Sequence, residues 1–307
     1  RKMEEVRSFE VSEQAEGSRL DRYLAECVPE ISRSYLQKLI RDGGVLLNGK
    51  PAKAGAKLAP GMEIELSVPE AREPEILPEN IPLDILYEDK DVILINKPKG
   101  MVVHPSAGHY SGTLVNALMF HCRDGLSGIN GVLPPGIVHR IDKDTTGVLI
   151  ACKNDRAHNA LAEQLKAHTI TRRYRAVVCG NLKEDEGTVD ASIGRHPVER
   201  KRMAVVRSGG KQAVTHYRVL ERFGAYTYIE CSLVTGRTHQ IRVHMASIGH
   251  PLLGDEVYGR GKNPFRLEGQ TLHAMVLGFI HPSTGEYMEF EAPLPAYFEE
   301  VLEKLRR

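Results

Sequence analysis

Residues 136–147, GIVHRIDKDTTG, combine residue types that can do chemistry on a polar substrate. Ile137 and Val138 favour an extended chain that enters a core. If the extension continues, the two-residue period of a strand places Arg140 and Asp142 on the same face. We therefore expect a cation and a carboxylate to project side by side from the end of a strand.

This pattern has two other interpretations. An exposed charged turn between two strands contains the same residue types, and a bare His-Arg-x-Asp motif does not tell the two apart. A kinase catalytic loop also contains these residues, but its Asp directly follows the Arg. The chain also lacks an ATP-binding glycine-rich loop, a DFG motif and an APE motif, so we set the kinase aside.

A second stretch with chemical potential reads LVTGRTHQIRVHMASIGHPLLG. Thr238 is a natural N-cap, and Gly249 is a natural residue to follow the end of a helix. Such a helix places His239 and Arg242 on one face, apart from an apolar stripe. Arg242 is thus a cation fixed on a short helix, in a domain whose Asp142 has no evident local partner.

The histidines of this stretch do not form a metal motif. His239 and His244 lack the spacing of an HExxH motif, and no carboxylate lies near them in the sequence. We therefore expect neither a metal ion nor a cofactor.

Length and composition describe a chain of ordinary globular type. Its 307 residues are enough for one large core and favour two domains. The net charge of +1 does not by itself indicate a nucleic-acid partner, so any basic surface must be local. The five cysteines are spread out without a CxxC pair, which favours reduced thiols in the cytoplasm over disulfides or a zinc site. The apolar runs are too short to span a bilayer, and we expect no membrane association.

The N-terminal segment carries such a local basic surface. Ser32 can cap a helix that runs to about Asp42, and Asn48-Gly49 between short apolar runs predicts a β-hairpin. Between residues 31 and 60, one acidic residue accompanies six basic ones: Arg33, Lys38, Arg41, Lys50, Lys53 and Lys57. A solvated helix face and a binding surface both fit this pattern.

A change of composition separates this segment from the rest of the chain. Residues 67–82 contain four prolines and several glutamates and have little apolar periodicity, which is typical of a linker between domains. We place the boundary near Glu75. This gives an N-terminal domain over residues 1–75, with its linker reaching to about residue 82, and a larger domain over residues 76–307.

The larger domain alternates strands with isolated helices. The pattern predicts a hairpin over 85–96, a helix over 113–120, strands over 148–153 and 172–179, and a helix capped by Asp155. In the second of these strands, Arg172, Tyr174 and Ala176 share one face. The βαβ rhythm of a parallel sheet is missing from the pattern. We therefore predict a mixed α+β fold around a largely antiparallel sheet.

A second basic stretch lies between residues 195 and 211. It contains one acid and six basic residues: Arg195, Arg200, Lys201, Arg202, Arg207 and Lys211. This stretch is either a solvated hairpin or a loop that clamps a phosphate backbone.

Three motifs in a fixed order carry a resemblance to a known family. GIVHRIDKDTTG, TRRYRAVVCG and LVTGRTHQIRVHMASIGHPLLGDEVYG resemble the pseudouridine synthases that modify large-subunit ribosomal RNA. The NKPKGMVVHPSAGHYSGTLVNAL stretch is most similar to the D-type subgroup. The segment from SRLDRYLAE to GMEIEL resembles the S4 domain, a helical pair with a hairpin that binds structured RNA. Together these resemblances cover nearly the whole chain.

The resemblance implies a reaction and a set of roles. The reaction breaks the N1–C1′ bond of a uridine, turns the base and rejoins it through C5, without a metal or a redox step. Asp142 matches the family's catalytic aspartate, which either attacks C1′ or removes a proton from C2′. Arg242 matches its ion-pair partner, and Arg140 matches the arginine that enters the stack where the uridine left. Tyr174 matches the tyrosine that packs against the base, and its phenol is also a candidate base for the C5 proton.

The basic residues and the resemblance together give the expected RNA contacts. These residues are Arg33, Lys38, Arg41, Lys50, Lys53, Arg200, Lys201, Arg202, Arg237 and His239. Arg237 and His239 either orient Arg242 or reach a phosphate.

We expect a monomer that acts on large-subunit rRNA or on the immature large subunit. A catalytically silent rRNA-binding assembly factor is one rival function, and a glycosylase that frees the base is another. The joint presence of Asp142, Tyr174 and Arg242 argues against the silent factor.

Overall fold

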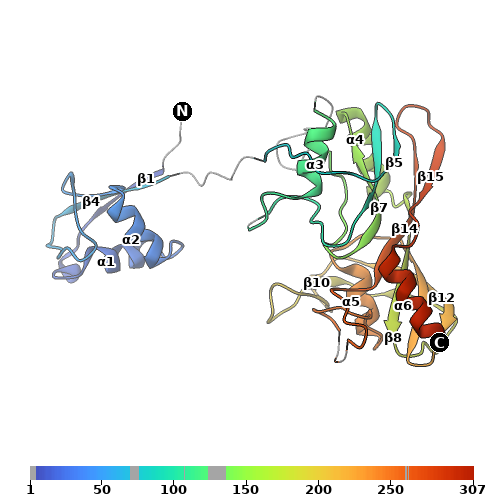
Figure 1. Ribbon diagram of the computed structural model, residues 1–307. Coiled ribbons are helices and arrows are strands. Elements are labelled where there is room, and N and C mark those ends of the chain that lie inside the picture. Colours follow the sequence, from blue (N-terminus) through green and yellow to red (C-terminus); the bar gives the residue numbers. More distant parts are fainter. Residues whose placement is uncertain (1–4, 70–75, 107, 124–135, 260, 262) are drawn as a thin grey trace. The chain divides into compact units, whose positions relative to one another are not determined.

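The computed structural model of the protein describes residues 5–69, 76–106, 108–123, 136–259, 261 and 263–307. The chain divides into two compact units, Arg1–Pro74 and Glu75–Arg307 (Figure 1). The expected boundary residue, Glu75, itself lies outside the described residues. Within the described ranges, no helix is both long enough and apolar enough to cross a membrane.

The smaller unit combines two α-helices with a four-stranded antiparallel sheet of order β1-β4-β2-β3. Its elements are β1 (Glu5–Glu10), the short 3-10 helix η1 (Glu13–Ala15), α1 (Leu20–Cys27), α2 (Arg33–Arg41), β2 (Val45–Leu47), β3 (Lys50–Pro51) and β4 (Glu63–Val68). Apolar side chains of both α-helices pack with those of β2 and β4 in a core of its own.

The local sequence signals of this unit are confirmed. Ser32 caps α2, because its hydroxyl accepts a hydrogen bond from the backbone N–H of Tyr35. Asn48 and Gly49, between β2 and β3, have φ angles of 48° and 76°. Positive φ at both central residues is what a two-residue hairpin turn of type I′ requires.

A buried carboxylate, Asp21, joins the two helices of the smaller unit. It is closed to solvent and accepts hydrogen bonds from Arg19 at 3.1 Å, Arg33 at 3.2 Å and Gln37 at 2.9 Å. The hydrogen bond from Arg19, opposed by burial, holds the pKa of Asp21 well below its usual range. Arg33 is therefore partly engaged inside the unit.

The larger unit contains most of the secondary structure. Its elements are β5 (Ile85–Glu88), β6 (Val92–Lys97), α3 (Leu114–His121), β7 (Thr146–Cys152), α4 (Asp155–Lys166), β8 (Thr171–Cys179), β9 (Glu186–Asp190), β10 (Ile193–Arg195), β11 (Met203–Val205), β12 (Val214–Arg222), β13 (Tyr226–Leu233), α5 (Gln240–Ser247), β14 (Leu272–Ile280), β15 (Tyr287–Glu291) and α6 (Ala296–Arg306).

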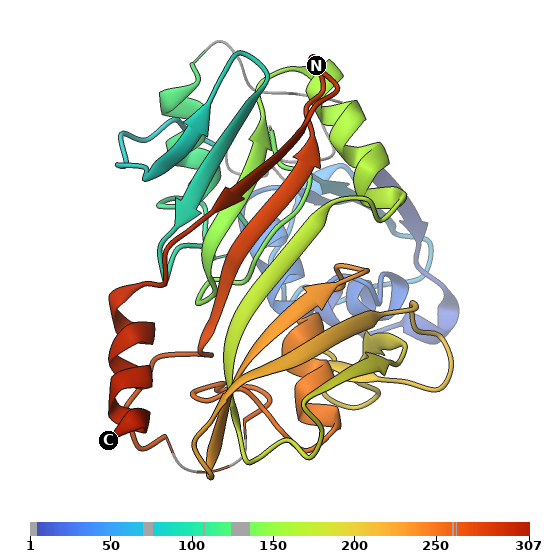
Figure 2. The ribbon, with the colours of Figure 1, turned by 90° about the vertical axis from the view of Figure 1, so that its right-hand side faces the viewer.

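Nine of these strands form one sheet in the order β5-β6-β7-β14-β8-β13-β12-β9, with β15 also paired to β14. Figure 2 shows them side by side, with β14 in orange-red near the middle. Among the strand pairs of the described residues, only β7 and β14 run parallel. Strands β10 and β11 form a separate antiparallel ribbon. The predicted α+β fold with a largely antiparallel sheet is confirmed.

Strands β7 and β14 meet at Gly147, directly after the first motif loop. Gly147 has a φ of 117°, and a Cβ at this position would lie 2.1 Å from the carbonyl oxygen of Ala274. Only glycine allows two backbones to approach this closely in that conformation. The glycine that ends the motif therefore fixes where the preceding loop joins the sheet.

Two helices show how local sequence sets the edges of the unit. Helix α6 packs on the sheet, where the rings of Phe298 and Tyr228 meet edge to face at 5.8 Å. Helix α4 is capped by Asn154, whose side chain accepts a hydrogen bond from the Ala157 N–H at 2.9 Å. The expected cap, Asp155, is instead the first helical residue, so that expectation was wrong by one position.

Candidate active site

A pocket of about 490 Å³ opens where three segments of the larger unit meet: the loop 136–145, strand β8 and the turn before α5. The charged and aromatic side chains that line it include Arg140, Asp142, Arg172, Tyr174, Arg237, His239 and Arg242. All four residues expected to take part in catalysis therefore border a single cavity.

The loop 136–145 is not a strand, so the expected strand geometry was wrong. Residues 139–142 join no ladder. At the edge of β7, a side chain supplies the acceptor that the carbonyl of a neighbouring strand would otherwise supply. His139 Nε2 accepts a hydrogen bond from the Ile150 N–H of β7 at 3.1 Å. Burial, helped by the nearby charge of Arg172, lowers the pKa of His139 to about 3, which keeps the ring a neutral acceptor.

Buried Lys97, at the end of β6, holds this loop from behind. Its Nζ donates hydrogen bonds to the carbonyls of Pro98, Met101 and Lys143 at 2.9, 2.9 and 2.8 Å. An ammonium group has one N–H for each of these carbonyls. Burial, opposed by two nearby aspartates, lowers the pKa of Lys97 to about 7. Because Lys143 directly follows Asp142, Lys97 positions the backbone beside that carboxylate.

Asp142 and Arg242 meet in the pocket. Asp142 Oδ2 accepts a hydrogen bond from Arg242 Nη1 at 3.0 Å. Burial opposes the charged form of Arg242, but hydrogen bonds with Asp255 and the charge of Asp142 outweigh it and raise the pKa of the guanidinium. The Asp142 side chain keeps an exposure of 27%, against 7% for Arg242. A carboxylate with a cation behind it and one edge open to a cavity can act as a nucleophile or as a base.

Asp255 holds Arg242 at the site, and the sequence pattern did not single it out. Its side chain is fully buried and accepts Arg242 Nε at 2.7 Å and Nη2 at 3.0 Å. It also accepts the backbone N–H groups of Val257 and Tyr258 at 2.9 and 3.0 Å. The available signal was the acid in the GDEVYG segment that ends the third motif. The sequence does not show that the chain folds back onto α5, which brings Asp255 to Arg242.

The start of α5 differs from the expected one. His239, with a left-handed φ of 57°, is the N-cap residue, and its side chain caps nothing. Thr238 was expected to cap the helix, but its Oγ1 instead accepts a hydrogen bond from Arg140 Nη2 at 3.3 Å. Thr238 therefore lines the pocket instead of capping the helix.

His239 belongs to the pocket rather than to an outer surface. Its Nε2 lies 3.6 Å from Asp142 Oδ1, and its Nδ1 lies 2.7 Å from the hydroxyl of Tyr258. Burial, opposed by the charge of Asp142, lowers the pKa of His239. Of the two roles expected for this residue, the contacts favour orientation of the ion pair, and a phosphate contact stays a prediction.

The second histidine of the motif, His244, points elsewhere. It is fully buried, with Nδ1 2.8 Å from Thr215 Oγ1 and Nε2 2.8 Å from the carbonyl of Ala191. His239 and His244 therefore do not converge on a common point.

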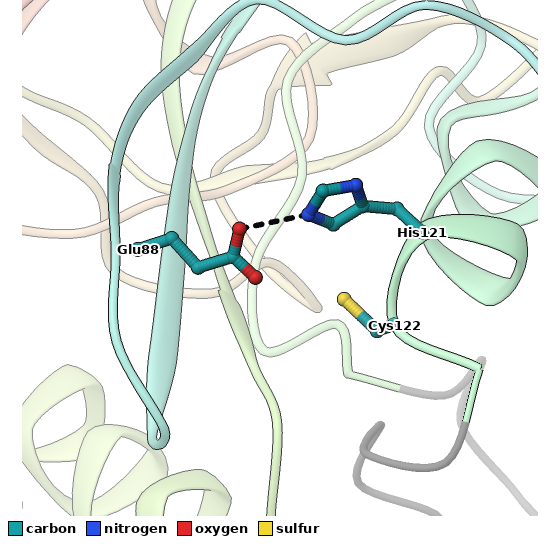
Figure 3. A group of neighbouring side chains, drawn as sticks. All are labelled: Glu88, His121 and Cys122. Atoms are coloured by element: carbon teal, nitrogen blue, oxygen red, sulfur yellow. Dashed lines mark hydrogen bonds and ion pairs between the residues drawn. The ribbon is translucent and has the colours of Figure 1, made fainter.

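Elsewhere in the larger unit, Glu88, His121 and Cys122 do lie close enough together to hold a metal ion (Figure 3). Glu88 already bonds His121 at 2.7 Å and Lys153 at 2.8 Å. The ammonium of Lys153 opposes a second cation at the same carboxylate. We interpret this cluster as an ion-pair network that joins β5 to α3 and to the end of β7.

Tyr174 lies on the buried face of β8, as the alternation of the strand predicts. Arg172, Tyr174 and Ala176 are all buried, so the expected strand face is confirmed. Burial, opposed by the charge of Arg172, raises the pKa of the Tyr174 phenol. The phenol is therefore protonated at neutral pH, which suits packing better than proton removal.

Arg140 lies at the open side of the pocket. Arg140 is exposed, and its guanidinium makes two long contacts, each of 3.3 Å, with His104 Nε2 and Thr238 Oγ1. Hydrogen bonds of this length are weak. The side chain can therefore exchange these partners for another at little cost.

The remaining residues expected to contact RNA lie mostly on exposed surfaces. In the smaller unit, the exposed ones are Arg33, Lys38, Arg41, Lys50 and Lys53. In the larger unit, the exposed ones are Arg200 and Lys201. Arg202 is half-buried, with its guanidinium over the Tyr258 ring at 5.3 Å, and Arg237 Nε donates to the Gln212 carbonyl at 2.8 Å. Their contacts with RNA stay predictions.

Comparison with known proteins defines the class. The sequence model of the family described as RNA pseudouridylate synthase matches residues 91–247, and that of the S4 domain matches residues 18–64. The chain therefore belongs to the RNA pseudouridylate synthase family and carries an S4 domain. The resemblance recognised in the motifs is confirmed.

Individual relatives match over almost the full length. The chain is 55% identical over 296 residues to the uncharacterized RNA pseudouridine synthase YlyB of Bacillus subtilis. This match covers 96% of this chain and 97% of that protein. It is 48% identical over 299 residues, 93% of each chain, to the ribosomal large subunit pseudouridine synthase D of Zymomonas mobilis. Among solved structures, human RNA pseudouridylate synthase domain containing 1 matches with a TM-score of 0.56 and 26% identity, covering 76% of this chain and 98% of that one.

Proposed function

We propose that this protein isomerises specific uridines of large-subunit ribosomal RNA to pseudouridine, with Asp142 as its catalytic carboxylate. One observation carries the proposal: Asp142 is paired with Arg242 at 3.0 Å and opens onto a pocket that Tyr174 also lines. The name of the Zymomonas mobilis relative supports large-subunit rRNA as the source of the substrate.

The uridine must first leave its stack to reach this pocket. Unstacking a base costs a few kcal/mol. Arg140, which lies at the open side and holds only long contacts, can enter the vacated space and offset part of that cost. Its planar guanidinium suits stacking between bases.

Asp142 then acts beside the sugar. It either attacks C1′ or takes the C2′ proton, and both routes need an ionised carboxylate with one free edge. Arg242 fixes the orientation of that carboxylate by a hydrogen bond, and His239 lies beside it at 3.6 Å. Lys97 fixes the backbone next to it. Preorganised contacts of this kind cost no rearrangement during the reaction.

Tyr174 holds the detached base while it turns. Its buried ring offers a packing face in the pocket, and its raised pKa keeps the hydroxyl protonated. The C5 proton therefore leaves to water or to another base rather than to a phenolate.

The S4 unit and the basic surface of the larger unit bind RNA around the target. The exposed lysines and arginines of α2 and of the hairpin after it suit phosphate contacts. In the larger unit, Arg200 and Lys201, in the loop between β10 and β11, suit the same purpose. We infer two domains, 1–75 and 76–307, that act on one RNA.

We further propose that the protein works as a monomer in the cytoplasm. The five cysteines are free thiols in the structure, which suits a reducing compartment. Sedimentation equilibrium tests the monomer, and a dimer at micromolar concentration would overturn it.

C5-tritiated large-subunit rRNA tests the proposed function, both as a naked transcript and within immature large subunits. We expect release of tritium without free uracil. A small-subunit rRNA transcript is the matched control and should release none. Free uracil in the product would indicate a glycosylase. Tight RNA binding without release from either form would indicate the silent assembly factor.

A further inference from the structure

Arg172 is a buried cation that lines the same pocket and has no carboxylate partner among the described residues. It lies two residues before Tyr174 on the same buried face of β8, lines the pocket and is 8% exposed. Within the part of the chain that the structure describes, no carboxylate pairs with it, and its Nε is buried without a hydrogen-bond partner.

The other arginines that line the pocket, Arg140, Arg237 and Arg242, each donate hydrogen bonds, whereas Arg172 has no hydrogen-bond partner among the described residues. Arg242 bonds two carboxylates, and Arg175, on the opposite face of β8, bonds Glu230 at 3.2 Å and Tyr228 at 2.8 Å. Buried charges are normally paired, because the loss of hydration is otherwise uncompensated. Burial lowers the pKa of Arg172, but an arginine stays charged at neutral pH. Arg172 is therefore a charged side chain at the pocket wall without a carboxylate partner among the described residues.

The pocket wall leaves room for this guanidinium. A Cβ at Gly236, in the turn before α5, would lie 2.2 Å from Arg172 Nη1. Gly236 does not have a positive φ, so its lack of a side chain serves space rather than backbone conformation. Gly236, within the third motif, thus leaves room for the guanidinium of Arg172.

We propose that Arg172 is a catalytic residue that binds the carbonyl oxygens of the target uracil and stabilises the negative charge that the base acquires when it leaves the ribose. This role rests on the isomerisation proposed above. A guanidinium presents several N–H donors in a fixed plane, which suits a delocalised anion better than an ammonium does. Donors aimed at developing charge in a dry site are among the strongest contributions to catalysis.

The step balances without a further reactant. When the C1′–N1 bond breaks, its electron pair stays on N1 and spreads onto O2 and O4. At the same time Asp142 either bonds to C1′ or takes the C2′ proton. After the base turns, C5 bonds to C1′, and Asp142 leaves or returns its proton. The C5 proton then passes to a base, and N1 takes up a proton.

The position of Arg172 favours the base over a phosphate as its ligand. Residues two apart on a strand lie roughly 7 Å apart on one face. A uracil packed on Tyr174 therefore presents its edge to the guanidinium of Arg172. A phosphate keeps much of its hydration and would meet cations at the open side, such as the exposed Arg140.

Arg172→Met and Arg172→Lys test this role, with Arg173→Met as the matched control. Arg173 lies on the opposite strand face and pairs with Glu289 at 3.0 Å. In single-turnover reactions on C5-tritiated large-subunit rRNA, Arg172→Met should slow tritium release about 100- to 1000-fold. RNA binding should change little, and Arg173→Met should keep the parent's rate. Arg172→Lys should recover part of the rate, because it keeps the charge and loses the planar donors.

Two further measurements separate catalysis from structure. RNA containing 5-fluorouridine carries a base whose anion is stabilised by the electron-withdrawing fluorine. The Arg172→Met defect should be smaller on this RNA, measured as loss of the parent nucleoside after digestion. Because no carboxylate among the described residues pairs with Arg172, Arg172→Met should also melt at or above the parent's temperature.

The outcomes distinguish this role from the proposed function. A parent that releases no tritium overturns both. An active parent whose Arg172→Met variant keeps the full rate, or has equal defects on both RNAs, overturns the role of Arg172 alone. Weaker binding with a salt slope reduced by about one would indicate a phosphate contact instead. Lower melting temperatures in both Arg172 variants would indicate a structural residue.

Discussion

The substitution Asp255→Asn perturbs the second carboxylate that holds Arg242. Asp255 Oδ1 accepts three hydrogen bonds, from Arg242 Nη2 and two backbone N–H groups, and Oδ2 accepts one from Arg242 Nε. Asparagine has one acceptor oxygen, which best replaces Oδ1. Its amide N–H groups then face the N–H of Arg242 Nε, so that a donor meets a donor in a site closed to solvent.

The expected loss of stability follows from these contacts. Removing one member of a buried ion pair costs about 3–5 kcal/mol. Arg242 keeps Asp142 at 3.0 Å, and three of the four hydrogen bonds have an acceptor left. We therefore expect about 3 kcal/mol, the lower end of that range. For a unit of this size, that lowers the melting temperature by about 6 to 12 °C. Because Arg242 loses the acceptor of its Nε, its guanidinium is held less firmly beside Asp142. We expect this to slow turnover about 100-fold.

Scanning calorimetry measures the transition of the larger unit directly. Asp185→Asn is the matched control, because Asp185 also pairs with an arginine, Arg222, at 2.8 Å, but its side chain is 94% exposed. An exposed pair contributes roughly 0–1 kcal/mol, so the control should shift the transition little. If Asp255→Asn shifts the transition no more than the control does, the reasoning about the buried pair is wrong.

Three further predictions follow from the site. Arg140→Ala should slow single-turnover tritium release while some activity and most RNA binding survive, because Arg140 fills the vacated stack; an unchanged rate would contradict that role. Tyr174→Phe should keep much of the activity, because the phenol stays protonated and its ring does the packing; a loss above about 100-fold would instead point to proton transfer. Burial lowers the pKa of Lys97 from 10.5 to about 7, so between these pH values the unfolded chain binds the additional proton and the free energy of unfolding rises with pH. Urea titrations of the parent and of Lys97→Met at several pH values measure this difference, and parallel pH profiles would contradict it.

Local signals predicted much of the fold. The cap at Ser32, the hairpin at Asn48-Gly49 and the buried face of β8 follow from neighbouring residues, and the structure has each of them. The antiparallel sheet followed from the missing βαβ rhythm. These features depend on contacts within a few residues of one another, which a single sequence displays.

The site was less accessible to the same reasoning. Asp142 and Arg242 lie 100 residues apart, and only the family resemblance suggested that they meet. Asp255 escaped notice because its role depends on the chain folding back onto α5. The alternation of residues 136–145 is typical of a strand, and we therefore predicted one. The alternation does not reveal that the β7 backbone bonds to the His139 side chain rather than to the backbone of this segment.

The left-handed turn at the start of α5 is a similar case. His239 adopts a φ of 57°, which few residues other than glycine do, and the Thr238 hydroxyl before it accepts from Arg140. Backbone conformations of this kind are held by the surrounding contacts rather than by local propensity. A cap rule that considers only residue types therefore selected the threonine.

The central claim is that Asp142 performs the chemistry, and Asp142→Asn tests it most directly. The parent and the variant are compared on C5-tritiated large-subunit rRNA, with RNA binding and thermal unfolding measured on the same preparations. We expect tritium release to be abolished while RNA binding and stability change little, because Arg242 keeps its bonds to Asp255. Release by the variant at a rate near the parent's would contradict the account and move the catalytic group elsewhere in the pocket.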